Sequence, residues 1–168
     1  MNELRIILYL CSKIMMLELH NVTIGQQIRS LSLTVNDGQL VCLLGPQGSG
    51  KTTLLRAVLG LIPIDGGHIS IDGELLTPKS APYFRRQMAY VPQHLSVPEG
   101  YKKLDLNYLQ LLTKAVESEN SLLIIDEPAQ HLSEKAQQTI DGLLLKASQH
   151  GKTVLAVNPR IQQNRVQL

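Results

Sequence analysis

Aromatic side chains are scarce in this sequence: its 168 residues include no tryptophan, one phenylalanine and five tyrosines. Proteins that bind single-stranded nucleic acid stack its bases on such rings, so the shortage argues against that class. An excess of one charge is also lacking, because 16 Lys and Arg residues stand against 14 Asp and Glu residues and leave a net charge of +2. So small an excess does not attract nucleic acid or an anionic membrane strongly. We therefore expect no nucleic-acid partner and a core of aliphatic side chains.

Cysteines and long hydrophobic runs are rare as well. Cys11 and Cys42 are far apart and match neither a metal-ligand nor a redox spacing, so we expect both to be reduced and Cys42 to be a buried, inert thiol. No disulfide framework is implied, which favours a cytoplasmic protein. The apolar run over residues 6–11 is too short to span a membrane, and no small-residue cleavage site follows it.

Length and composition predict one globular domain. A chain of 168 residues has the size of a single domain, and 43% hydrophobic with 18% charged residues is typical of a folded one. Residues 1–15 fit no regular pattern, whereas an alternation typical of a strand begins at Leu17. We therefore expect an N-terminal extension over residues 1–15, with translation starting at Met15 or Met16, and a single domain over residues 16–168.

Hydrophobic patterning predicts an α/β fold. Period-2 alternation predicts strands over residues 17–22 and 31–35 in a hairpin-rich opening, and a further strand of the antiparallel layer over residues 66–73. Continuous apolar runs predict three strands buried on both faces, over residues 39–44, 122–125 and 153–157. Helical periodicity predicts three helices, over residues 51–60, 107–116 and 134–148. The expected architecture is a mainly parallel sheet flanked by helices, with a small antiparallel β layer.

A glycine-rich loop separates the first buried strand from the first helix. It matches the phosphate-binding pattern G-x-x-x-x-G-K-S/T in full and consists of Gly45, Pro46, Gln47, Gly48, Ser49, Gly50, Lys51 and Thr52, with Thr53 next. Glycines let the backbone wrap closely, so that N–H groups and the helix N-terminus point at phosphate oxygens. We expect Lys51 to reach the β- and γ-phosphates and the Thr52 hydroxyl to ligate Mg²⁺. A chance glycine turn is the alternative, and it does not account for the Lys and Thr.

Two acidic residues follow the second buried strand. Asp126 and Glu127 come directly after residues 122–125, at the carboxyl end of a strand, where open α/β sheets bind ligands. We expect Asp126 to hold Mg²⁺ through water and Glu127 to polarise a water opposite the γ-phosphate. An acidic pair in a solvated turn is the alternative, and the phosphate loop favours the catalytic interpretation.

Together these motifs resemble the ATP-binding-cassette (ABC) ATPases that drive membrane transporters, over most of residues 16–160. Residues 45–53 (GPQGSGKTT) look like the Walker A loop of that family, residues 122–128 (LLIIDEP) like its Walker B motif with the catalytic Glu, and residues 90–93 (YVPQ) like its Q-loop. The resemblance implies binding of ATP with Mg²⁺ and slow ATP hydrolysis. It also implies that Gln93 contacts Mg²⁺ and the attacking water.

The sequence departs from the family where the second half of the ATP site would lie. The segment between Gln93 and Asp126 is too short for the family's α-helical subdomain, so that subdomain is expected to be reduced. Residues 102–106 (KKLDL) stand where the LSGGQ signature would be and do not resemble it. The chain is therefore expected to be a trimmed cassette.

Other family contacts are also altered. Pro159 stands at the position of the switch histidine, with Asn158 as a weaker substitute, and Pro has no N–H to donate. The D-loop equivalent at residues 129–133 lacks the usual aspartate, and no aromatic residue near Ile24 can stack on adenine. Each loss removes a different contact to nucleotide or partner.

The resemblance implies two protein partners, a transmembrane permease contacted through residues 93–101 and a second copy of the chain. It places the protein in the cytoplasm, held at the inner face of the membrane through the permease. Two other functions stay open. A nucleotide-gated binding module without useful turnover is favoured by the lost contacts to developing charge. A small P-loop kinase is the third, although its phosphate loop usually lies near the N-terminus.

Overall fold

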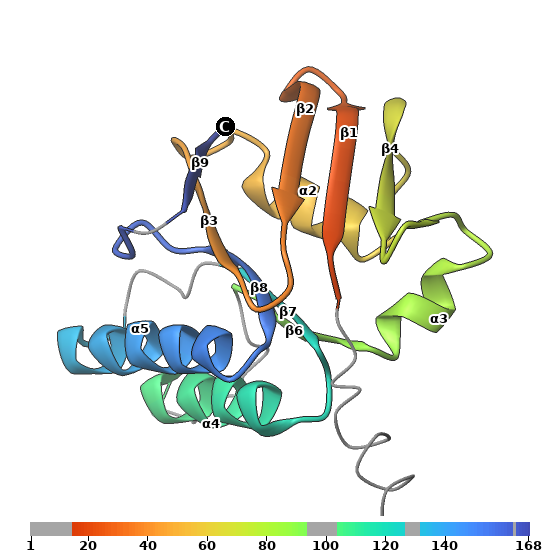
Figure 1. Cartoon of the computed structure of the whole chain (residues 1–168). Helices are drawn as coiled ribbons and strands as arrows, with labels where there is room; N and C mark the ends of the chain where they lie inside the picture. Colours follow the sequence, from red (N-terminus) through yellow and green to blue (C-terminus); the bar gives the residue numbers. More distant parts are fainter. Residues whose placement is uncertain (1–14, 94–103, 127–131, 163) are drawn as a thin grey trace, which may run out of the picture.

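The chain folds into two β-sheets with helices around them, as Figure 1 shows for a computed structural model that describes residues 15–93, 104–126, 132–162 and 164–168. Within these residues one sheet has four strands: β1 (Leu17–Ile24), β2 (Ile28–Val35), β4 (Gly66–Ile71) and β5 (Glu74–Leu75). The other has five: β3 (Leu40–Leu44), β6 (Met88–Val91), β7 (Leu122–Ile125), β8 (Thr153–Val157) and β9 (Arg165–Gln167). The helices are α2 (Lys51–Val58), α3 (Ala81–Arg85), α4 (Leu104–Glu117) and α5 (Glu134–Gln149).

Strand order and direction differ between the two sheets. The four-stranded sheet has the order β2-β1-β4-β5 and is antiparallel, whereas the five-stranded sheet has the order β6-β7-β8-β3-β9 and is parallel. The predicted combination of a parallel sheet with a small antiparallel layer is thus confirmed. The turn at residues 36–38 carries the chain from β2 into β3 and so joins the two sheets, while β1 and β2 form a hairpin with each other.

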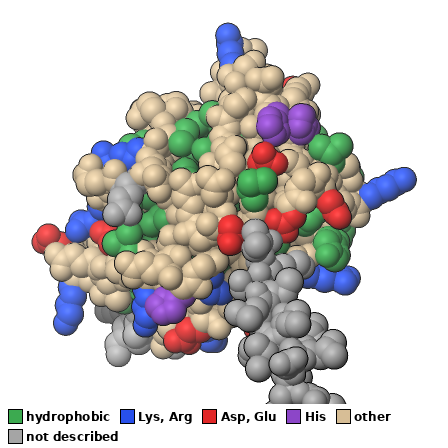
Figure 2. All heavy atoms as spheres, in the orientation of Figure 1, with side chains coloured by type: hydrophobic (Ala, Val, Ile, Leu, Met, Phe, Trp, Pro, Cys, Tyr) green, Lys and Arg blue, Asp and Glu red, His purple; other side chains and the backbone are tan. Residues whose placement is uncertain are grey.

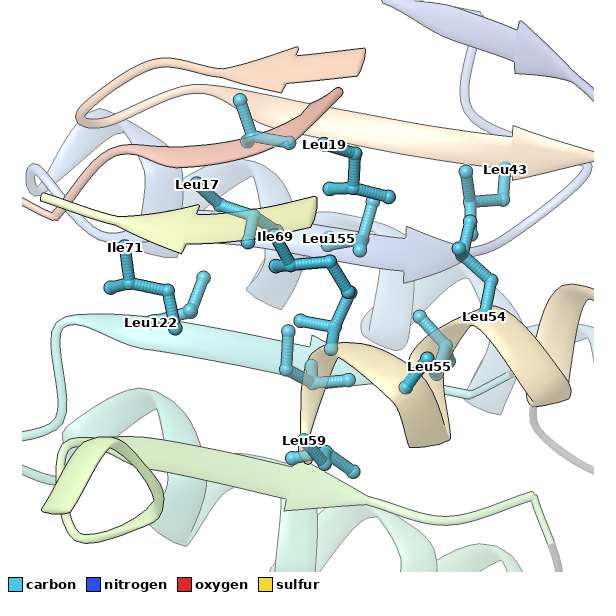
Figure 3. Close-up of a cluster of buried hydrophobic side chains, with 14 of the residues drawn as sticks. Leu17, Leu19, Leu43, Leu54, Leu55, Leu59, Ile69, Ile71, Leu122 and Leu155 are labelled. Carbon is cyan, nitrogen blue, oxygen red and sulfur yellow. The ribbon is translucent and has the colours of Figure 1, made fainter. Parts of the chain in front are cut away.

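The parallel sheet separates two clusters of buried side chains, which explains the continuous apolar runs of its strands. Successive side chains of a strand point to opposite faces. On one face Leu43 and Leu155 pack against α2 and the antiparallel sheet, as Figure 3 shows. On the other face Cys42 and Ala156 pack under α4 and α5, which lie side by side in Figure 1. Strands buried on both faces need apolar residues at every position.

Cys42 behaves as the sequence predicts. Its side chain is buried and unpaired with any other cysteine of the described residues, and burial raises the pKa of its thiol to about 11. A thiol with so high a pKa is a poor nucleophile at neutral pH. Cys11 lies outside the described residues, as do residues 1–14 as a whole, so the N-terminal extension stays a prediction.

The elements differ from the predicted ones mainly at their ends. The strand predicted over residues 66–73 ends at Ile71, because Asp72 has a φ of 53° and begins a turn with Gly73. The short strands β5 and β9 were not predicted, since two or three residues carry too little periodicity to be recognised. In the described part of the chain, no helix is both long and apolar enough to cross a membrane.

The antiparallel sheet is polar on its outer face and irregular where β1 meets β4. His20 and His68 are register partners, and their rings stack with centroids 4.7 Å apart; a pair of adjacent histidines is visible in Figure 2. Beyond this pair the register shifts, and Gly67 takes a φ of 77°. A Cβ at Gly67 would lie 2.3 Å from the carbonyl oxygen of His20. The close approach of the two backbones therefore requires glycine.

A Gly67→Ala variant is expected to be less stable than a Gly73→Ala variant by roughly 1–3 kcal/mol in free energy of unfolding. Both glycines have a positive φ, 77° and 76°, so both variants carry similar backbone strain. Only Gly67 also meets a neighbouring backbone, because a Cβ at Gly73 would have nothing within 4 Å. Urea denaturation of the two variants measures the difference, and equal stabilities would show that β1 and β4 do not approach as described.

Candidate nucleotide-binding site

The residues singled out by their motifs meet at the carboxyl edge of the parallel sheet. Ile125 on β7 pairs with Ala156 on β8, and the next residue of β8, Val157, pairs with Leu43 on β3. Asp126, the residue after β7, therefore lies level with the end of β3. Because β8 lies between these two strands, they are about 10 Å apart. That span fits a phosphate group with a metal ion between the loop after β3 and the acidic residue after β7. Gln93 lies two residues beyond β6, the neighbour of β7, at the same edge.

The glycine-rich loop leads from β3 into α2 with its backbone in conformations that favour glycine. Gly50 has a φ of 94° and stands at the N-cap of α2. A Cβ there would lie 3.1 Å from both Gln27 Cβ and Ile28 Cγ1. The helix has no side-chain cap and no acidic residue in its first turn. Its first N–H groups, at the positive end of the helix dipole, are thus available to an anion.

Lys51 is held over the loop by the loop's own carbonyl groups. Its Nζ donates to the carbonyl oxygens of Gly45 and Pro46, both at 2.8 Å. An ammonium group has three protons, so a third remains for a further acceptor. The hydroxyl of Ser49 is buried and has no hydrogen-bond partner among the described residues. A buried hydroxyl and a fixed cation beside exposed N–H groups form a cradle that suits phosphate.

Gln27 supports the loop from the antiparallel sheet, a contact that no sequence pattern predicts. This residue lies in the turn between β1 and β2. Its Nε2 donates to the carbonyl oxygen of Gly48 at 3.0 Å, and its Oε1 accepts from the hydroxyl of Thr53 at 3.4 Å. No local pattern marks such a residue, because its partners are more than twenty positions away and only the packing of the two sheets brings them together.

A Gln27→Ala variant is expected to bind ATP about 2- to 12-fold more weakly, the worth of one net hydrogen bond. Without the amide, the Gly48 carbonyl loses a partner and the loop is less well fixed before it meets phosphate. Equilibrium titration with ATP measures the change. Gln26→Ala, a neighbouring exposed position in the same turn, is the matched control. An unchanged affinity in Gln27→Ala would show that the contact does not support the loop.

Asp126 is a buried acidic residue at the sheet edge, with 2% of its surface exposed. Its N–H donates to the carbonyl oxygen of Val91 at 2.9 Å, and its own carbonyl oxygen accepts from the hydroxyl of Tyr108 at 3.0 Å. Burial, and in second place the Asp126 charge, raise the pKa of both Tyr90 and Tyr108. The Asp126 side chain is thus buried, and a buried carboxylate attracts a cation more strongly than one in water does.

The oxygen donors at this edge fit Mg²⁺. The Thr52 hydroxyl, in the first turn of α2, and the Asp126 carboxylate are hard oxygen ligands of the kind that Mg²⁺ binds. In the described parts of the chain no cluster of three His, Cys, Asp or Glu residues could hold a metal ion alone. Mg²⁺ characteristically takes one or two protein ligands and completes its shell with substrate phosphates and water, so the donor set suits a nucleotide-bound ion.

Asn158, which follows β8 beside the position of the switch histidine, is held by hydrogen bonds to neighbouring residues. Its Nδ2 donates to Asp141 Oδ1 on α5 at 2.7 Å, and its Oδ1 accepts from the backbone N–H of Arg160 at 2.9 Å. Arg160 in turn pairs with Asp141 Oδ2 at 3.1 Å. The amide is therefore part of a network that ties the segment after β8 to α5, and its role as a weaker substitute for the histidine stays a prediction.

Several predicted residues fall elsewhere or outside the described chain. Ile24 is 7% exposed and packs in the core, so its side chain offers no surface to adenine. Glu127 lies outside the described residues, as do residues 129–131 of the D-loop equivalent. Of the signature segment, residues 102–103 are likewise outside, and residues 104–106 begin α4. The predicted role of Glu127 as a catalytic residue thus stays a prediction.

Comparison with known families and proteins finds ABC transporters and ATP-binding proteins of transport systems. A family model described as "ABC transporter" matches residues 28–152. The chain is 41% identical over 86 residues to an uncharacterized ABC transporter ATP-binding protein of Haemophilus influenzae. It is 49% identical over 72 residues to the sulfate/thiosulfate import ATP-binding protein CysA of Bacillus cereus, and 46% identical over 72 residues to the lipopolysaccharide export system ATP-binding protein LptB of Escherichia coli.

These alignments cover only part of each protein. They span 49%, 43% and 42% of this chain, and 33%, 20% and 30% of the three relatives. Solved structures match over more of the fold. An ATP-binding subunit of an ABC transporter aligns with a TM-score of 0.75 at 20% identity, over 91% of this chain and 85% of its own. An ATP-binding cassette dimer in a post-hydrolysis state with ADP and Pi aligns with a TM-score of 0.72 at 21% identity, over 90% and 94%.

Proposed function

Because this chain belongs to the family of ABC transporter ATP-binding proteins, we propose that it binds ATP with Mg²⁺ at the carboxyl edge of its parallel sheet and hydrolyses it slowly. One observation carries the proposal: the loop of residues 45–50 and Asp126 lie at the same edge of the parallel sheet, with only β8 between their strands. A phosphate cradle alone would suit many anions. A cradle with a buried carboxylate at this spacing suits a nucleotide phosphate chain that carries a divalent cation.

Each residue of the site has a distinct proposed role. The loop N–H groups and the Lys51 ammonium hold the β- and γ-phosphates, and Thr52 with Asp126 holds Mg²⁺. The ion supplies neutralisation of the negative charge on the phosphate oxygens. Gln93 orients a water near the γ-phosphate, and Glu127 accepts a proton from that water as it attacks. The products are ADP and inorganic phosphate.

The proposed partners follow from the family. The relatives CysA and LptB are named as ATP-binding proteins of an import and an export system. By analogy we propose that this chain pairs with a transmembrane permease through residues 93–101, at the inner face of the membrane. A second copy of the chain is the other proposed partner, since a solved structure of the same fold is a dimer.

A nucleotide-gated module without useful turnover is the second candidate. The Asn158 network favours it, because Asn158 is tied to α5 and Pro159 has no N–H to donate. Asn158 Nδ2 is held by Asp141, and Pro159 offers no donor, so less is available at these two positions to stabilise charge on the γ-phosphate than a histidine would supply. Each such donor lowers the barrier by a few kcal/mol. The small P-loop kinase is not supported, because the ABC transporter family model matches the phosphate loop and the strand before Asp126.

Steady-state phosphate release from the purified full chain with Mg-ATP tests the proposal. Release that is proportional to protein and absent from a Lys51→Ala preparation purified in the same way would support hydrolysis at this site. Saturable ATP binding without release above the blank would instead establish the binding module. Phosphate release that persists in the Lys51→Ala preparation would point to a contaminating enzyme and contradict the proposed site.

A further inference from the structure

Tyr108 links α4 to the residue proposed to hold Mg²⁺. Its side chain is 2% exposed, and its hydroxyl donates to the carbonyl oxygen of Asp126 at 3.0 Å. The ring packs in the cluster between the parallel sheet and the helices, with Val91 and Ile125 among its members. The hydrogen bond is thus buried, and breaking it would leave a buried carbonyl group without this donor.

Both peptide groups around Asp126 are fixed by this arrangement. The N–H of Asp126 donates to Val91 on β6, which holds the peptide before the residue. The carbonyl group accepts from Tyr108 on α4, which holds the peptide after it. With both peptides held, only the side-chain torsions of Asp126 remain to be set.

We infer that Tyr108 is a positioning residue for Mg²⁺: by holding the Asp126 carbonyl group, it sets the direction in which the Asp126 carboxylate leaves the edge of the sheet. This inference rests on the proposed function. Groups that orient a metal-binding carboxylate contribute to metal affinity although they do not touch the ion. Tyr108 also makes the metal site sensitive to the placement of α4, the helix between the Q-loop segment and β7.

The test compares ATP binding with and without Mg²⁺ in a Tyr108→Phe variant of the full chain. Phenylalanine keeps the ring in the core and removes only the hydroxyl. Equilibrium titration in excess Mg²⁺ and in EDTA gives two dissociation constants, and their ratio is the gain in affinity that Mg²⁺ provides. We expect this gain to fall about tenfold in the variant, with the EDTA constant unchanged.

Thr153→Val is the matched control for a general loss of stability. The Thr153 hydroxyl also makes a buried hydrogen bond to a carbonyl group, that of Met15 at 2.7 Å, away from the site. We expect the control to lower the unfolding midpoint in urea and leave the gain from Mg²⁺ as in the wild type.

Three results would overturn the inference: an unchanged gain in Tyr108→Phe, an equal loss of affinity with and without Mg²⁺, or the same fall in Thr153→Val. A wild-type chain that binds ATP no better with Mg²⁺ than in EDTA would overturn the proposed function itself, and the inference with it. These outcomes are distinguishable because the wild-type ratio is measured first.

Discussion

A Lys51→Ala variant is expected to bind ATP roughly 10- to 150-fold more weakly than the wild type and to release no phosphate above the blank. The ammonium group is the fixed cation of the loop, and a hydrogen bond to a charged group is worth about 1.5–3 kcal/mol. Its contacts to the carbonyl groups of Gly45 and Pro46, at 2.8 Å, also tie the loop to the helix. The variant thus loses both the charge that meets phosphate and part of the support of the loop.

Equilibrium titration with ATP measures this effect, and Lys135→Ala is its control. Lys135 is exposed in the first turn of α5, so its removal changes the net charge equally without touching the loop. We expect the control to bind ATP like the wild type. If both variants bind ATP equally weakly, the affinity depends on the overall charge of the protein. If Lys51→Ala binds ATP like the wild type, the loop does not hold the phosphates of ATP.

A Glu127→Gln variant is expected to lose about 10²- to 10⁴-fold in turnover while its ATP affinity stays within a few-fold of the wild type. The amide keeps the size of the side chain and cannot accept a proton from the attacking water. Substrate binding relies on the loop and on Asp126, so it should be spared. Phosphate release under saturating Mg-ATP gives the turnover, and titration gives the affinity.

The matched control for this change is Glu119→Gln, an exposed glutamate after α4. We expect it to leave turnover as in the wild type. A Glu127→Gln variant with wild-type turnover would contradict the assignment of the base. If the wild type itself has no turnover, Glu127 is not a catalytic base, and the protein is a nucleotide-gated binding module.

The fold was predictable because its signals are local and repeated. The continuous apolar run ending at Ile125 predicts a strand buried on both faces, and β7 is such a strand. The pattern of residues 45–52 predicts both the loop and the helix that follows it, since its glycines and its Lys-Thr pair occur together. The order of these elements then places the loop and Asp126 at one edge of the sheet.

The supporting contacts were not predictable, because they depend on tertiary packing. Gln27 reaches Gly48 only when the two sheets are packed, and Tyr108 reaches Asp126 only when α4 lies under the parallel sheet. In the sequence both look like ordinary residues of a turn and of an amphipathic helix. The contact of Asn158 with Asp141 on α5 is of the same kind, because only the packing of α5 beside β8 brings the two residues together.

Equilibrium titration of the purified full chain with ATP in the presence of Mg²⁺, with Lys51→Ala titrated beside it, decides whether the glycine-rich loop holds the nucleotide. We expect saturable binding of one ATP per chain, weakened in excess EDTA and at least tenfold weaker in the variant. Absence of saturable binding, or binding of equal strength in the Lys51→Ala variant, would contradict this expectation.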